Sequence, residues 1–326
     1  MTMTVAASAR APARHAPSAR MWAASFAAIH DRAVIANALI FGALAPVVWR
    51  ADPHALAVGV AALALLGFPH GGADDRVARS LLRPAWGRAW LVVFAVPYLV
   101  LAGAVMLAAW VLPGWSALAF VLVASFHFGW EETLPRHAGD TRRRDTVSII
   151  ALGGMPFALP LLFHPEGTSD FLYLLSGTRW PMAPLGAGAL LWSAAFVLHV
   201  AGIVRTGDAR RREGAALAAL ALALALLPPL AGFALFFLTV HVPRHTAYLA
   251  RRHAPSESGR ARSFALRAGL AMSLAALPLV VAVWWVMPEP GPERFVRAVF
   301  WSTWALTLPH VLLSLLEARA GRAPLA

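Results

Sequence analysis

Ten apolar stretches follow one another along this chain, separated by short polar loops. The loops contain turn-forming pairs such as Asp52-Pro53 and Pro113-Gly114. A helix that crosses a bilayer needs about 20 mostly apolar residues. The pattern therefore predicts an all-α, polytopic integral membrane protein with about ten transmembrane helices, and their expected ranges are 33–49, 55–74, 89–112, 116–131, 146–163, 185–204, 215–227, 231–250, 263–287 and 295–316.

The loops also indicate orientation. Arginine clusters fall before the first stretch and after every even-numbered one, whereas the other loops carry only isolated arginines. Because cytoplasmic loops are enriched in basic residues, we expect both termini to be cytoplasmic and the protein to lie in the cell (inner) membrane. We expect a disordered basic tail at 1–29, a single membrane-embedded helical domain at 30–318 and a short C-terminal tail at 319–326.

Composition excludes several kinds of protein. Of the 326 residues, 59% are hydrophobic and only 13% are charged, against about 25% charged residues in a soluble domain. The net charge of +12 follows the loop arginines, so it indicates contact with membrane lipid and no nucleic-acid partner. The absence of cysteine excludes disulfides and thiolate metal sites. The absence of lysine excludes a photoreceptor that holds retinal as a Schiff base.

Candidate chemistry centres on histidine. His241 and His245, in the segment LTVHVPRHTAYL, are four residues apart and so share one helix face. At the same predicted membrane depth, on other helices, lie four further histidines: His70, His127, His199 and His310. Ionisable groups inside a bilayer cost a few kcal/mol each, so such a group is usually buried and functional. Imidazole is also the commonest metal ligand and suits iron, zinc and copper.

Two carboxylates follow histidines at helical spacing. Asp74 lies four residues after His70, and Glu131 lies four residues after His127. A carboxylate that accepts the second ring N–H of a coordinating histidine fixes its tautomer, so we expect Asp74 and Glu131 to support His70 and His127 respectively. The alternative is that both acids only end their helices at the membrane surface, where acids at a C-terminus oppose the helix dipole.

Other residues are candidates for a cavity lining. His199 and His310 have no carboxylate nearby in sequence, and both are expected to line a substrate cavity. Whether they or His30 contact a metal stays open. Aromatic residues that flank the histidines would line an apolar tunnel or pack the core: Phe126, Phe128, Trp130 and Tyr248.

The motifs FPHGGADD, SFHFGWEE, HVPRH and TLPH occur in this order on separate apolar stretches. In this combination the chain resembles the Brp/Blh family of membrane-bound beta-carotene dioxygenases, from about Gly67 to the last stretch. The run GADD departs from the more usual ALD-type run after PHG.

The resemblance implies a non-haem Fe(2+) enzyme, a beta-carotene 15,15'-dioxygenase. It would use dioxygen to cleave beta-carotene, or a related carotenoid, at the central double bond, which yields two molecules of all-trans-retinal. The residue range 30–318 would then be the catalytic domain. In that family four histidines are thought to hold the iron, and they map onto His70, His127, His241 and His245, with Asp74 and Glu131 as their hydrogen-bond partners.

Other functions stay open. The enzyme could act on an apocarotenoid or another polyene. A lipid desaturase or hydroxylase is disfavoured because those enzymes carry adjacent histidine pairs, and this chain has none. A metal or proton-coupled transporter would also use membrane histidines, but it would spread them along a path across the bilayer. A pigment-assembly accessory protein would bind no metal. The sequence also leaves open the oxygen stoichiometry, the oligomeric state and the role of the N-terminal tail.

Overall fold

The chain folds into helices joined by short connections. The computed structural model describes residues 17–67, 73–134, 145–206, 210–253, 274, 276–288 and 290–320, and this part contains no strand, which confirms the all-α prediction. The principal helices are α1 (Pro17–Val48), α2 (Pro53–Gly67), α3 (Asp74–Trp86), α4 (Trp90–Val111), α5 (Pro113–Glu132), α6 (Thr146–Phe163), α7 (Pro165–Ser176), α8 (Met182–Arg205), α9 (Arg211–Leu226), α10 (Pro229–Phe236), η4 (Phe237–His241), α11 (Val242–His253) and α13 (Gly291–Ala320). The turn η2 (Gly87–Ala89) joins α3 to α4, and a further helix spans Ala276–Val286.

The long apolar helices of this structure are typical of a membrane protein. Five described segments are long and apolar enough to cross a bilayer, namely Phe26–Val48, Asp74–Val111, Thr146–Phe163, Met182–Arg205 and Gly291–Ala320. Their outer faces are apolar: Leu99 and Leu107 of α4 and Leu191 of α8 are 66%, 64% and 77% exposed. The expected number of ten spans is not reached by this measure. Helices α2, α9 and α10 have 15, 16 and 8 residues, Ala276–Val286 is also short, and α5 is not among the five segments.

Element boundaries agree with the sequence in some places and differ in several others. The range 146–163 is reproduced by α6. Helix α1 already begins at Pro17, so 17–29 is helical and not a disordered tail, while 1–16 lies outside the described residues. At the other end α13 continues to Ala320, and 321–326 lies outside the described residues. The expected connection 164–184 contains the amphipathic helix α7.

The second apolar stretch does not run on to Asp74. Helix α2 ends at Gly67, and Asp74 opens the separate helix α3, with Asp75 beside it in the first turn. Acidic side chains at a helix N-terminus interact favourably with the helix dipole. The dipole argument raised against the helix-end alternative for Asp74 was therefore wrong, because Asp74 lies at the start of a helix and not at its end.

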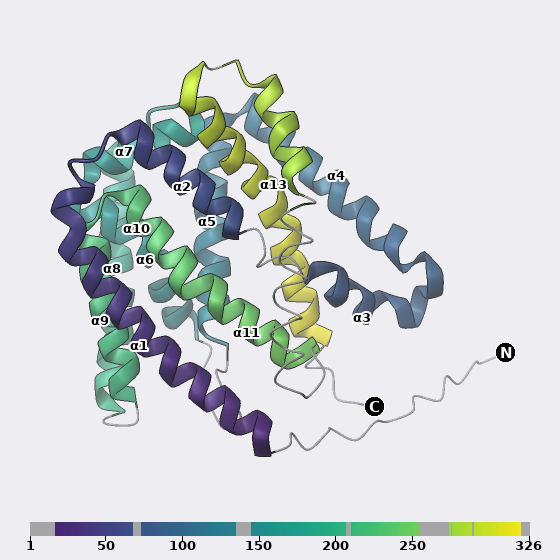
Figure 1. The fold of residues 1–326 in the computed structure, drawn as a ribbon, viewed down its shortest axis with the longest axis horizontal. Helices are drawn as coiled ribbons and strands as arrows, with labels where there is room; N and C mark the ends of the chain where they lie inside the picture. The colour runs from purple at the N-terminus through teal and green to yellow at the C-terminus, as the bar shows by residue number, and fades with distance from the viewer. Residues whose placement is uncertain are drawn as a thin grey trace.

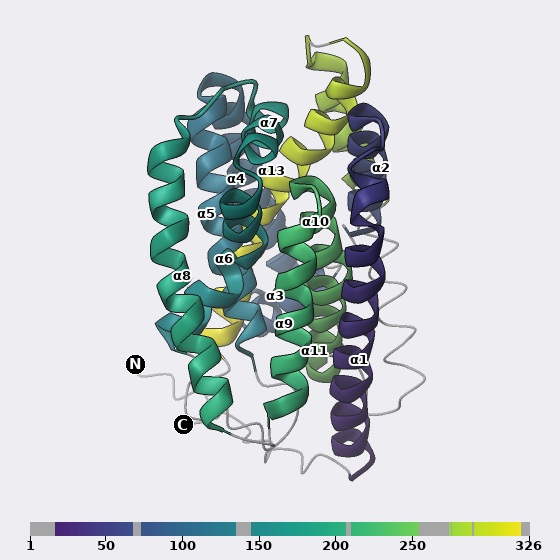
Figure 2. The ribbon, with the colours of Figure 1, turned by 90° about the vertical axis from the view of Figure 1, so that its left-hand side faces the viewer.

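The packed helices form a bundle in which α10, η4 and α11 cross the middle obliquely, between α1 and α13 (Figure 1). Viewed from the side, the long helices run roughly parallel, with α8 at one edge and α1 and α2 at the other (Figure 2). Helix α6 packs against α5, α8 and α9, whereas α13 packs against α2, α3 and α4. The bundle core is aromatic and aliphatic, with Phe236, Met155 and Leu224 almost fully buried.

Two glycines bring α5 and α6 together. A Cβ added to Gly129 of α5 would lie 1.9 Å from the carbonyl oxygen of Ile149, and one added to Gly153 of α6 would lie 1.8 Å from that of Ser125. Only glycine permits such close backbone approach. Because Gly129 lies between His127 and Glu131, this contact fixes the position of both side chains.

Candidate functional site

The HVPRH segment contains a local break in helical geometry. Between α10 and α11, residues Phe237–His241 form a π-helical turn, in which the Val242 N–H donates to the Phe237 carbonyl five residues earlier. Pro243 has no N–H and cannot donate to the Thr239 carbonyl as an α-helix would require. Turns of this kind are frequent at functional sites.

Four buried imidazoles from four different elements meet at this turn. His241 and His245 lie 6.0 Å apart between ring centroids, and their exposed fractions are 0% and 2%. His127 of α5 lies 5.0 Å from His241 and 6.2 Å from His245. His310 of α13 lies 5.1 Å from both His127 and His245. We call these four residues the histidine cluster.

The ring spacings match those of imidazoles around one ion. With a metal–nitrogen distance of about 2.1 Å, each ring centroid lies roughly 3.3 Å from the metal, so neighbouring ligand rings have centroids roughly 4.5–5.5 Å apart. The 5.0 Å and both 5.1 Å spacings fall in this range, and those of 6.0 and 6.2 Å exceed it by less than 1 Å. In the described part of the chain no group of three or more His, Cys, Asp or Glu side chains already has a metal-binding arrangement, and His70 lies outside that part.

Two buried carboxylates contact the cluster. Glu131 Oε2 lies 3.1 Å from His245 Nδ1, although Glu131 was expected to support His127. Asp74 Oδ1 lies 2.7 Å from His310 Nδ1, and its expected partner His70 lies outside the described residues. The i+4 spacing gives only a shared helix face, whereas these contacts join α5 to α11 and α3 to α13. The carboxylates therefore connect different helices of the bundle.

These contacts fix two tautomers. An ionised carboxylate only accepts hydrogen bonds, so Nδ1 of both His245 and His310 carries the hydrogen. In a neutral ring the lone pair is then on Nε2. Metal-binding histidines commonly donate their other N–H to a carboxylate in this way.

Tyr98 was missed in the sequence analysis. Its hydroxyl donates to Asp74 Oδ2 at 3.0 Å, with the Leu306 carbonyl as a second acceptor at 3.3 Å. The phenol thus holds the oxygen of Asp74 that does not contact His310. Tyr98 is one of only three tyrosines in a chain with 30 other aromatic Phe and Trp residues, and that scarcity was the one available signal.

A buried ion network adjoins the cluster. Arg244, which directly precedes His245, pairs through Nη1 with Glu132, which directly follows Glu131. The other terminal nitrogen of Arg244, Nη2, lies 3.6 Å from Oδ1 of Asp31 in α1. Helices α11 and α5 are therefore joined by two adjacent pairs, one ionic and one between histidine and carboxylate. A charged residue inside an apolar stretch is costly unless paired, so Arg244 in HVPRH was itself a sequence signal for this network.

The other candidate histidines, His30 and His199, form hydrogen bonds with groups that are not part of the histidine cluster. His30 Nε2 donates to the Thr239 carbonyl at 3.0 Å, so the nitrogen is used to hold α1 against the π turn. His199 Nδ1 lies 3.0 Å from Ser148 Oγ, between α8 and α6. His310, expected to line a cavity with its contact to a metal left open, is the one whose ring joins His127 and His245.

The candidate aromatic residues pack in different parts of the bundle. Phe128 is buried and its ring centroid lies 4.6 Å from that of His241. Phe126 is 40% exposed and packs with Trp130, 5.8 Å away. Tyr248 packs against the small apolar cluster that includes Ala73 and Leu249. Phe128 is therefore the candidate that forms a wall of the histidine cluster.

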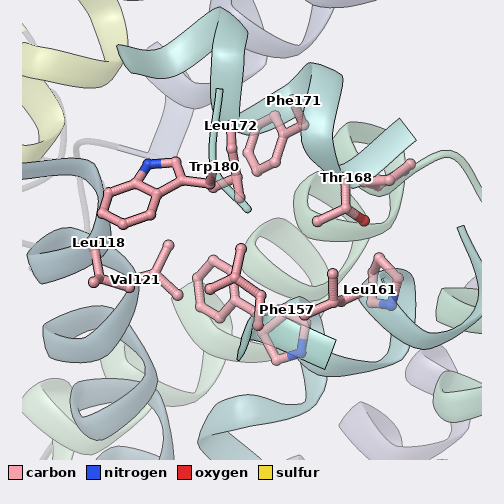
Figure 3. Close-up of a pocket in the computed structure, with 12 residues that line it drawn as sticks. Leu118, Val121, Phe157, Leu161, Thr168, Phe171, Leu172 and Trp180 are labelled. Carbon is pink, nitrogen blue, oxygen red and sulfur yellow. The ribbon is translucent and has the colours of Figure 1, made fainter. Parts of the chain in front are cut away.

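An apolar cavity of about 60 Å³ lies between α5, α6 and α7 (Figure 3). Leu118 and Val121 of α5, Phe157 and Leu161 of α6, and Phe171, Leu172 and Trp180 are among the side chains that surround it. Phe157 also stacks on Phe128, with centroids 6.2 Å apart and planes 8° apart. Since Phe128 contacts His241, a continuous aromatic path leads from the cavity to the histidine cluster.

The fold and site define a class: a helical membrane protein with a dry site of imidazoles and carboxylates, bordered by aromatic side chains. The family model described as beta-carotene 15,15'-dioxygenase matches residues 61–316. The chain therefore belongs to the beta-carotene 15,15'-dioxygenase family, as the resemblance of its motifs predicted.

Two curated relatives match over most of their length. A probable beta-carotene 15,15'-dioxygenase Blh of Halobacterium salinarum is 27% identical over 279 residues, which cover 77% of this chain and 81% of the relative. A beta-carotene 15,15'-dioxygenase of the uncultured marine bacterium 66A03 is 27% identical over 264 residues, which cover 78% and 90%. No solved structure matches the chain.

Proposed function

We propose that this protein is an iron-dependent dioxygenase that cleaves beta-carotene at its central double bond and releases two molecules of all-trans-retinal. In this reaction the central bond breaks, and each of its two carbons takes one oxygen atom from dioxygen. The observation that carries the proposal is the buried histidine cluster, in which carboxylates fix the tautomers of His245 and His310. The proposal is also supported by the chain's membership of a family named for this reaction.

The residues fit ferrous iron. His127, His241 and His245 would hold the ion together with His70, which the sequence motif PHG adds to the set. Neutral imidazoles suit iron, and the chain has no cysteine that could offer a softer thiolate ligand. Bound iron would supply the activation of dioxygen. Glu131 would keep the hydrogen on Nδ1 of His245 and so keep Nε2 available for the metal.

The surroundings of the cluster suit an apolar substrate. His127, His241 and His245 are all at most 2% exposed, so the protein excludes bulk water from the reacting groups. Phe128 provides an apolar wall beside His241, and the aromatic path through Phe157 leads to the cavity of Figure 3. We propose that the polyene lies along this aromatic wall, with its central double bond beside the histidine cluster.

The membrane assignment agrees with the proposed substrate. Carotenoids dissolve in the bilayer, and an enzyme embedded in the cell membrane can take them up laterally. We propose that the continuous unit α10, η4 and α11 and the shorter helices α2 and α9 add crossings to the five long apolar segments, with both termini cytoplasmic. Loop arginines support that orientation.

The test is expression in bacterial cells that accumulate beta-carotene, followed by pigment extraction and chromatography. The variant His241→Ala removes the most buried ring of the cluster. His54→Ala is a matched control, because His54 is exposed on α2 and pairs with Glu293. We expect carotene loss and retinal formation with the unsubstituted protein and with His54→Ala, and neither with His241→Ala.

Two outcomes would contradict the proposal in different ways. Unchanged carotene with a folded, iron-loaded protein would keep the metal site and indicate another polyene as the substrate. Unchanged carotene with a folded protein that binds no iron would favour a transporter or a pigment-assembly accessory protein. Iron is measured on the purified protein by elemental analysis, so the two outcomes are separable.

A further inference from the structure

His310 is linked to a hydrogen-bonded chain from two other helices. Tyr98 of α4 donates to Asp74 of α3, and Asp74 accepts from Nδ1 of His310 on α13. We propose that His310 is an additional metal-site histidine, which binds through Nε2 the same iron as His127, His241 and His245. This proposal rests on the proposed function, because it assumes that the cluster holds iron.

The position of the ring supports a shared ion. The His310 centroid lies 5.1 Å from His127 and 5.1 Å from His245, and the ring planes are inclined by 83° and 76°. Both distances fall within the range of roughly 4.5–5.5 Å expected for neighbouring ligand rings. The His127–His241 spacing, between two residues that the family motifs already assign to the metal, is 5.0 Å. By geometry His310 is as much a member of the cluster as His127.

The hydrogen bond of Nδ1 determines the tautomer of His310. Nδ1 donates to Asp74 at 2.7 Å, so Nε2 carries the lone pair in the neutral ring. Asp74 uses Oδ1 for His310 and Oδ2 for Tyr98, which prevents the carboxylate from turning. His245 and Glu131 repeat the same arrangement on the other side of the cluster. The parallel matters because His245 is one of the residues that the motif HxxxH assigns to the metal.

A purely structural role is the competing explanation. The pair would then only fasten α3 to α13, and no metal property would depend on His310. Burial does not separate the two explanations, because His310 and Asp74 are 3% and 2% exposed in either case. Metal affinity and the spectrum of the bound ion do separate them.

The experiment compares the purified full-length protein with His310→Ala, His310→Gln and Asp74→Asn. His199→Ala is the matched control, because His199 is also buried but is bonded to Ser148, away from the cluster contacts. Each protein is loaded with Fe(2+), and affinity is measured by chelator competition. X-ray absorption then reports the number of imidazoles on the iron.

We expect both His310 variants to lose one imidazole from the absorption spectrum and to bind iron at least 10-fold more weakly. Asp74→Asn is expected to weaken binding by about 10- to 100-fold while the imidazole count stays the same. Added free imidazole should restore binding to His310→Ala, since it can occupy the space of the lost ring. His199→Ala should match the unsubstituted protein.

The inference would be overturned if His310→Gln, folded as judged by its thermal transition, kept both the affinity and the imidazole count. That result would leave the proposed function intact when the unsubstituted protein is iron-loaded and active. An unsubstituted protein that binds no iron and cleaves no carotene would instead remove the proposed function, and the inference with it. If His310→Ala fails to fold, His310→Gln and the imidazole count carry the test.

Discussion

Replacing Gly129 by Ala would test whether the contact between α5 and α6 sets the geometry of the histidine cluster. The added Cβ would lie 1.9 Å from the Ile149 carbonyl oxygen, whereas such contacts are essentially never shorter than 3.0 Å. Because the obstacle is backbone and not a flexible side chain, the two helices must separate by about 1 Å. His127 lies two residues from Gly129 and must move with α5.

The expected effects on stability and activity differ in size. Overpacking costs about 1–3 kcal/mol, and Ala recovers about 1 kcal/mol of helix propensity relative to Gly, so the net loss of stability is small. A displacement of about 1 Å at a reacting site can lower the rate by about 10²-fold. We therefore expect a folded protein with slightly lowered thermal stability and strongly reduced carotene cleavage.

The assay measures retinal formation, bound iron and the thermal transition on the same purified samples. Gly103→Ala on α4 is the matched control, because an added Cβ there meets nothing within 4 Å. That variant should keep full activity. If Gly129→Ala is as active and as iron-loaded as Gly103→Ala, the close approach of α5 and α6 does not determine the position of His127, and the reasoning is wrong.

Three further variants test other parts of the site. Glu131→Gln weakens the acceptor for His245 Nδ1 and should lower iron affinity by about 10- to 100-fold in chelator competition; unchanged affinity would argue against this support. Arg244→Met leaves Glu132 buried without its cation and should lower stability by about 3–5 kcal/mol in thermal unfolding, and a second substitution, Glu132→Leu, should restore most of it. Leu161→Trp fills part of the cavity and should raise KM for beta-carotene at unchanged iron content, and an unchanged KM would exclude the cavity from the substrate path.

The helices could be predicted because their signal is local. Apolar length and polar loops sufficed to locate α6 to the residue and α4, α5, α8 and α13 within four residues, whereas α1 begins at Pro17 and not at 33. The same local signal failed where a break depends on the neighbouring structure. Asp74 was assigned to the end of the second stretch, but the chain starts a new helix there, with the acid at its favourable end.

Within the site, the sequence predicted which residues take part better than it predicted which side chains they contact. His241 and His245 follow from spacing on one helix, and the motifs added His127, which meets His241 in the structure. The partner expected for Glu131 was wrong, because a spacing of four residues describes one helix face and carries no information about the helix packed against it. The partner expected for Asp74, His70, lies outside the described residues. His310 was underrated for the same reason, since its acid is 236 residues away.

The sequence by itself determined an all-α membrane protein, the histidine-rich chemistry and the family. These follow from composition, from apolar length and from short motifs, and none of them needs the relative positions of helices. Only the tertiary structure decided that Glu131 supports His245, that Tyr98 and Asp74 hold His310, and that Arg244 joins Glu132. The physical reason is that these contacts depend on how closely helices approach, and at α5 and α6 the missing side chains of Gly129 and Gly153 set that approach.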